Sequence, residues 1–107
     1  MEALRIARVV GYDEGVAAYT ANLASMALDR KDWPGAEVLA REALSLSEKV
    51  GRQELIASDC RNLAKALALQ DKKVEALSYA LRAVEIFSRL RSPRLTDAHQ
   101  VLALCES

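Results

Sequence analysis

The sequence has few of the residues from which catalytic and metal sites are usually built. It contains one histidine, His99, so a metal motif based on paired histidines cannot form. Cys60 and Cys105 are far apart and lack metal-type spacing, and we expect both to stay free thiols. The four glycines are scattered and form no phosphate-binding loop, and no Gly-x-Ser-x-Gly motif is present. We therefore expect no enzyme activity, no bound metal and no cofactor.

Two further absences narrow the class of protein. Lys plus Arg and Asp plus Glu are equal at 15 each, whereas nucleic-acid binders normally need an excess of basic residues. No apolar run approaches the roughly 18 residues that span a bilayer, and the first residues lack the pattern of a secretory signal. The composition favours a cytoplasmic protein without nucleic-acid or membrane partners.

Leucine and alanine are abundant, and they recur in an internal repeat. Glu2-Ala3-Leu4 returns as Glu42-Ala43-Leu44, and Asn22-Leu23-Ala24 returns as Asn62-Leu63-Ala64, both at an offset of 40 residues. Apolar residues within each block follow the spacing of an amphipathic helix and not the alternation of a half-buried strand. The sequence therefore predicts an all-α fold made of repeated units.

Helix-breaking and capping residues separate these blocks. Gly11 and Gly51 stand where a helix would close in a left-handed conformation, and Asp32 and Asp71 are candidate N-caps. The sequence predicts six helices, at about 2–10, 13–30, 33–50, 53–70, 73–90 and 94–106. Short links between such helices favour antiparallel hairpins, which stack into an α-α superhelix with a concave side.

This pattern resembles the tetratricopeptide repeat (TPR) family, in which a helix A and a helix B pair through small residues. The matching positions are Leu23, Ala24, Ala27, Trp33, Ala36, Ala40 and Ala43 in one copy, and Leu63, Ala64, Leu67, Ala76, Ala80 and Ala83 in the next. The period of 40 exceeds the usual length of about 34 residues and is similar to the extended, kinesin-light-chain-like branch. The aromatic residues typical of helix A are missing, with Thr20 and Cys60 in their place. HEAT-type repeats, whose period is near 40, are the alternative fold.

The repeat register predicts how the chain is divided. We expect one TPR-like domain over residues 1–107, with residues 1–11 as a half repeat (helix B), residues 12–51 and 52–91 as full repeats, and residues 92–107 as a terminal helix. An unpaired helix at either end indicates an excised part of a longer array, or a homo-oligomer formed through open repeat ends.

The resemblance implies a binding groove on the concave side, lined by helix A. The corresponding residues are Ala18, Ala21, Asn22, Ser25, Leu28 and Asp29 in one repeat, and Ser58, Arg61, Asn62, Lys65, Ala68 and Leu69 in the next. In such a groove, Asn22 and Asn62 would bond either the backbone of a bound peptide or a neighbouring helix. Arg61 and Lys65 would grip a carboxylate, although half of a chaperone-type carboxylate clamp is absent. The basic cluster from Arg89 to Arg94 would either attract an acidic partner or compensate a helix dipole.

The function implied by this groove is protein–protein interaction. We expect the chain to bind a peptide or helix of a protein partner, as an adaptor, scaffold or regulatory region. The alternative is a self-assembly or spacer segment of a larger multidomain signalling ATPase or transcription regulator.

Overall fold

The computed structural model describes the backbone of residues 2–107 and the side chains of residues 12–107. All regular structure in this range is helical. The helices are α1 (Glu2–Asp29), α2 (Trp33–Val50), α3 (Gln53–Ala68), α4 (Lys73–Arg89) and α5 (Leu95–Glu106). None of them, over the described residues, has both the length and the apolar character needed to cross a membrane. The expected all-α class is confirmed.

The predicted break at Gly11 is wrong, because α1 continues through this residue from Glu2 to Asp29. The described chain therefore has five helices where six were expected. A glycine inside a helix is unfavourable by only about 1 kcal/mol relative to alanine, so it does not by itself end one. The side chains of residues 2–11, assigned from the sequence to half of a helix B, lie outside the described part.

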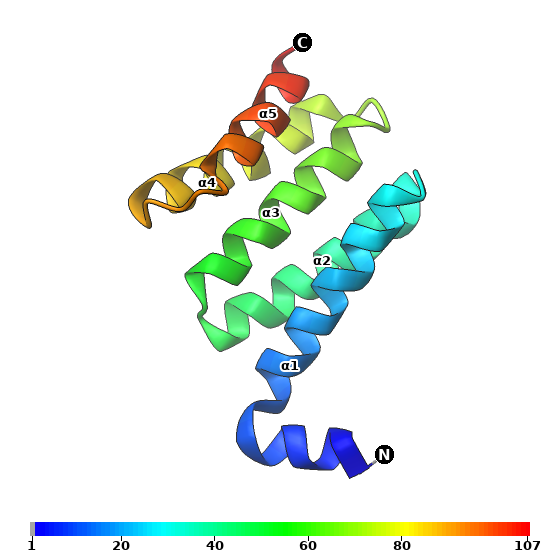
Figure 1. The fold of residues 1–107 in the computed structure, drawn as a ribbon. Coiled ribbons are helices and arrows are strands. Elements are labelled where there is room, and N and C mark those ends of the chain that lie inside the picture. Colours follow the sequence, from blue (N-terminus) through cyan, green and yellow to red (C-terminus); the bar gives the residue numbers. More distant parts are fainter. Residues whose placement is uncertain (1) are drawn as a thin grey trace.

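The helices form two layers of antiparallel hairpins. Helix α1 packs on α2, and α3 packs on α4, while α2 also packs on α3 and joins the two hairpins. Helices α1, α3 and α5 contact one another in sequence order and form one layer. Figure 1 shows α3 between α1 and α5, with α2 and α4 behind them. This is the arrangement of a TPR-like helical solenoid, and it places the helix A elements side by side.

The turns between helices repeat their backbone conformation at the interval seen in the sequence. Lys31 and Asp71, in the turns after α1 and α3, have φ angles of 63° and 64°. Gly51 and Arg91, in the turns after α2 and α4, have φ angles of 81° and 52°. Each pair is 40 residues apart, so the period is present in the backbone as well as in the side chains.

The capping residues agree with the sequence in one repeat and differ in the other. Asp32 caps α2, as expected, because its Oδ1 accepts a hydrogen bond from the backbone N–H of Gly35 at 3.1 Å. Asp71 was expected to cap α4, and this prediction is wrong. The residue preceding α4 is Lys72, which makes no side-chain capping bond, while Asp71 occupies the left-handed turn. Aspartate tolerates that conformation better than most residues, which favours its use in the turn.

Alanine dominates the contacts between helices. Ala24, Ala40, Ala64 and Ala80 are at most 1% exposed, and all belong to one core cluster. Because alanine adds only a methyl group, the helix backbones approach closely, and a larger side chain at these positions would force the hairpins apart. Phe87, Leu63 and Leu67 supply the bulk of this core.

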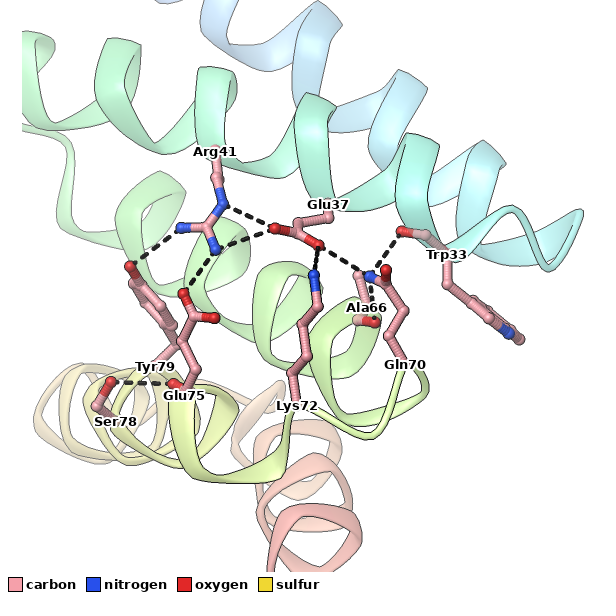
Figure 2. A network of polar contacts seen from close by, with 9 residues as sticks. All are labelled: Trp33, Glu37, Arg41, Ala66, Gln70, Lys72, Glu75, Ser78 and Tyr79. Atoms are coloured by element: carbon pink, nitrogen blue, oxygen red, sulfur yellow. Dashed lines mark hydrogen bonds and ion pairs between the residues drawn. The ribbon is translucent and has the colours of Figure 1, made fainter.

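A polar network joins the two hairpins around Glu37 of α2, between this helix and the residues from Gln70 to Glu75 (Figure 2). The Glu37 carboxylate accepts hydrogen bonds from Gln70 at 2.9 Å and from Lys72 at 3.2 Å, and it pairs with Arg41 at 3.0 Å. Arg41 also pairs with Glu75 of α4 at 2.8 Å. Partial burial by itself would raise the pKa of Glu37, but the donors from Gln70, Lys72 and Arg41 outweigh burial and lower it. The network fixes α2 against the hairpin of α3 and α4.

One carboxylate lies in the core itself. Asp59 of α3 is 0% exposed, and its Oδ2 accepts a hydrogen bond of 2.6 Å from the equally buried hydroxyl of Ser47 in α2. Its second oxygen, Oδ1, has no hydrogen-bond partner among the described residues. Burial raises the pKa of Asp59 to about 6, although the Ser47 hydroxyl acts in the opposite direction.

Candidate functional site

A hollow of about 430 Å³ lies along the layer formed by α1, α3 and the start of α5. Each of these elements contributes polar side chains together with small or apolar ones. The lining residues are Ala18, Ala21, Asn22, Ser25, Glu54, Leu55, Ser58, Arg61, Asn62, Arg94 and Asp97. Its volume is within the range of pockets that hold a small ligand or a short stretch of peptide.

Charged groups of both signs line the hollow. Arg61 and Arg94 supply two cations, and Glu54 and Asp97 supply two carboxylates. Opposite charges in one recess favour a ligand that presents both signs, or one that is mainly uncharged, over a strongly anionic one. The surface is therefore unlike the uniformly basic face of a nucleic-acid binder.

Both arginines are already engaged within the chain. Arg94 donates to the hydroxyl of Ser58 at 3.0 Å, which ties the start of α5 to α3. Arg61 donates to the side-chain carbonyl of its neighbour Asn62 at 2.8 Å. Burial lowers the pKa of Arg61, the nearby Asp97 carboxylate raises it, and the Arg94 guanidinium lowers it again. An acceptor group of a ligand would restore part of the solvation that Arg61 has lost.

Four of the eight residues proposed as the partner-binding site are brought together in this hollow. Asn22 and Ser25 project from α1, and Arg61 and Asn62 project from α3. Asn22 is exposed, whereas Asn62 is only 3% exposed. The side-chain carbonyl of Asn62 accepts a hydrogen bond from Arg61 of its own helix, and its role toward a bound peptide stays a prediction.

Lys65 lies beside the hollow and not within it. It lines a second recess of about 250 Å³ between α3 and α5, which it shares with Arg61 and Asp97. Arg61 and Lys65 are one helical turn apart, and Arg61 lines both recesses. The two cations thus lie along one path on the surface of α3, as the helical spacing predicted.

The remaining three residues lie elsewhere. Leu28 is 7% exposed and belongs to a core cluster with Ala36 and Ala66, so it contributes to packing and not to the hollow. Asp29 is exposed at the C-terminal end of α1, and Leu69 follows the last residue of α3. Neither lines the two recesses. Positions near the ends of α1 and α3 are thus too far along the helices to reach the hollow.

Four of the lining residues were not predicted from the sequence: Glu54, Leu55, Arg94 and Asp97. Glu54 and Leu55 occupy the first turn of α3, whereas the groove positions were taken from the middle of the helix. Arg94 was grouped with a basic cluster near a helix C-terminus. The structure places it as the residue before α5, at a helix N-terminus. The position of Arg94 after the Ser92-Pro93 helix break was the signal that could have separated it from Arg89.

Comparison with known families agrees with this architecture. Residues 16–50 match the family model of the tetratricopeptide repeat. The chain carries a tetratricopeptide repeat. The match begins within α1 and ends at the last residue of α2, so it covers one helix A–helix B hairpin. It is consistent with the extended, kinesin-light-chain-like form. No curated protein matches the chain. TPR units typically serve in protein–protein interaction, and this is the general role that the match indicates for the chain.

Proposed function

We propose that the hollow formed by α1, α3 and α5 binds a peptide segment or helix of a protein partner, in an adaptor or regulatory role. The observation that carries the proposal is the convergence of three helix A elements on one recess with hydrogen-bonding and charged side chains. Asn22 offers an exposed amide, which donates to and accepts from a peptide backbone. Arg61 and Lys65 favour ligands that place an acidic or carboxyl group along α3.

The mixed charge of the site sets the expected ligand. A partner segment with one acidic group near Arg61 and Lys65, and an uncharged or basic stretch near Glu54, would complement the lining. The small residues Ala18 and Ala21 leave room for its backbone on α1. The affinity would depend on a few well-placed contacts and not on the total buried area.

Selection from a random peptide library, followed by calorimetric titration of the selected peptides, tests this proposal. With the double variant Arg61→Glu and Lys65→Glu, we expect the dissociation constant to rise at least about tenfold, or about 1.4 kcal/mol. Val74→Glu is the matched control, because Val74 is 91% exposed on α4 in the other layer. Unchanged affinity in the double variant, with or without an effect of Val74→Glu, would place the peptide outside the hollow.

A further inference from the structure

Arg61 and Asp97 lie where the hollow and the second recess meet. Among the described residues, these two line both recesses, and every other lining residue belongs to one of them. Arg61 projects from α3, and Asp97 lies in the first turn of α5. Because α3 lies between α1 and α5 (Figure 1), a segment bound across α3 passes this pair on its way from the hollow to the second recess.

The helices that face α3 on its two sides differ in charge. On one side, α1 contributes to the hollow the uncharged residues Ala18, Ala21, Asn22 and Ser25. On the other side, α5 contributes to the second recess the residues Asp97, Gln100, Val101 and Leu104. Both sets have the spacing of a single helix face. An acidic group held at Arg61 therefore meets no repulsion from α1, whereas α5 presents the carboxylate of Asp97.

The charges of Arg61 and Asp97 influence each other without forming a direct contact. Burial is the main influence on the pKa of Arg61 and lowers it, but the Asp97 carboxylate acts in the opposite direction. Within the part of the chain that the structure describes, Arg61 donates to Asn62 at 2.8 Å and makes no direct ion pair with Asp97. Asp97 itself is exposed. A ligand can therefore contact both charges without first breaking an ion pair.

The start of α5 holds Asp97 in a fixed place beside α3. Arg94, the residue before α5, donates to the hydroxyl of Ser58 at 3.0 Å and ties the beginning of α5 to α3. Asp97 follows three residues later, in the first turn, where free backbone N–H groups interact favourably with a negative charge. The boundary between the two recesses therefore has a cation on the α3 side and an anion on the α5 side, both in defined positions.

We propose that Asp97 selects partner segments that place an acidic side chain at Arg61 and a basic side chain on the α5 side, and that it rejects segments that are acidic on both sides. This inference rests on the proposed function, because it names the chemistry of the segment that the same site binds. The two charges of such a segment each meet the opposite charge in the site, while a second acidic group is repelled by Asp97. The occupant is a peptide of mixed charge and not an acidic tail.

Selection from one random peptide library on two forms of the protein tests the role of Asp97. The wild type should select peptides with an acidic and a basic residue close together, and Asp97→Asn should select peptides enriched in neighbouring acidic residues. Asparagine keeps the shape of the side chain, and Asp97 is exposed, so we expect the variant to fold. Glu106→Gln is the matched control, because Glu106 is exposed at the other end of α5 and lines neither recess. Selection by Asp97→Asn of the same peptides as Glu106→Gln would overturn the proposal.

A charge exchange between peptide and protein gives a second measurement that does not depend on the Asp97→Asn variant. Replacing the basic residue of a selected peptide by glutamate should weaken binding to the wild type at least about tenfold in calorimetric titration, and Asp97→Lys should recover most of this loss. An equal loss in both proteins would overturn the selective role of Asp97. In that case, loss of binding in the double variant Arg61→Glu and Lys65→Glu would still support the proposed function. A library that yields no peptide for the wild type would overturn both proposals.

Discussion

The buried carboxylate of Asp59 makes a sharp prediction about stability and pH. In the folded chain this side chain is 0% exposed, only one of its oxygens is hydrogen-bonded, and its pKa is raised from 3.8 to about 6. A carboxyl whose folded pKa lies above its unfolded value holds its proton longer in the folded state. Its contribution to stability is therefore greatest below about pH 4, declines as the pH rises to about 6, and stays low above that value.

The size of this effect follows from the shift. A difference of one pKa unit corresponds to about 1.4 kcal/mol, so the charged Asp59 carboxylate lowers the free energy of unfolding by about 3 kcal/mol at neutral pH relative to acid. Asp59→Asn keeps the shape and the acceptor for Ser47 but carries no charge. We expect the substitution to raise the free energy of unfolding by about 2 kcal/mol at pH 7.5, after allowance for the amide hydrogens that it buries.

Urea unfolding followed by circular dichroism, for wild type and variant at several pH values, measures this difference directly. The gain from Asp59→Asn should fall as the pH drops below about 6 and become a loss of about 1 kcal/mol in acid, because the wild-type carboxyl is then protonated while the cost of the buried amide hydrogens remains. Glu42→Gln, at an exposed position of α2, controls for the loss of one negative charge. A difference between wild type and Asp59→Asn that does not vary with pH would refute the reasoning.

Further substitutions test the left-handed turn at Gly51 and the polar network around Glu37. Gly51→Ala should lower the free energy of unfolding by about 1 kcal/mol, because φ is 81° at this position. Gly15→Ala should raise it by about as much, because Gly15 lies inside α1 and no atom lies within 4 Å of the added methyl group. Thermal unfolding of both variants checks the opposite signs. Glu37→Gln should lower the free energy of unfolding by about 1 kcal/mol at neutral pH. This loss should fade in acid, because protonation of the wild-type carboxylate weakens its bonds from Lys72 and Arg41. Urea titrations at neutral and acid pH check the prediction, and an equal loss at both pH values would count against the ionic network.

Much of the fold could be predicted because helical spacing and small-residue contacts are local properties of the sequence. The stripes containing Ala24, Ala40, Ala64 and Ala80 fixed which helix faces meet, and all four residues are buried as expected. The failure at Gly11 has a physical cause. The same glycine is compatible with a left-handed turn, as at Gly51, and with a helix interior, so residue type alone does not distinguish the two.

The candidate site was less predictable, because it depends on how three helices are placed in space. Asn22 and Arg61 were found from their helix positions, and both line the hollow. Arg94 could not be assigned in the same way, since it reaches the hollow from the turn before α5 and is oriented by Ser58, 36 residues earlier in the chain. Leu28 could not be separated from the groove residues by sequence, because only the structure shows that it packs in a core cluster with Ala36 of α2 and Ala66 of α3.

Equivalent positions of a repeat have different roles according to whether another helix packs on them. Tyr19 and Asp59 occupy the same register position, yet Tyr19 is 65% exposed and Asp59 is 0% exposed. The usual preference would put the aromatic residue inside and the acid outside. Since α2 covers α3, the buried Asp59 lowers the stability of that joint at neutral pH, whereas Tyr19 leaves an apolar surface open on α1. One repeat position thus has two different effects: the acid at Asp59 lowers the stability of the packing of α2 on α3, and the aromatic residue at Tyr19 leaves an apolar surface exposed on α1.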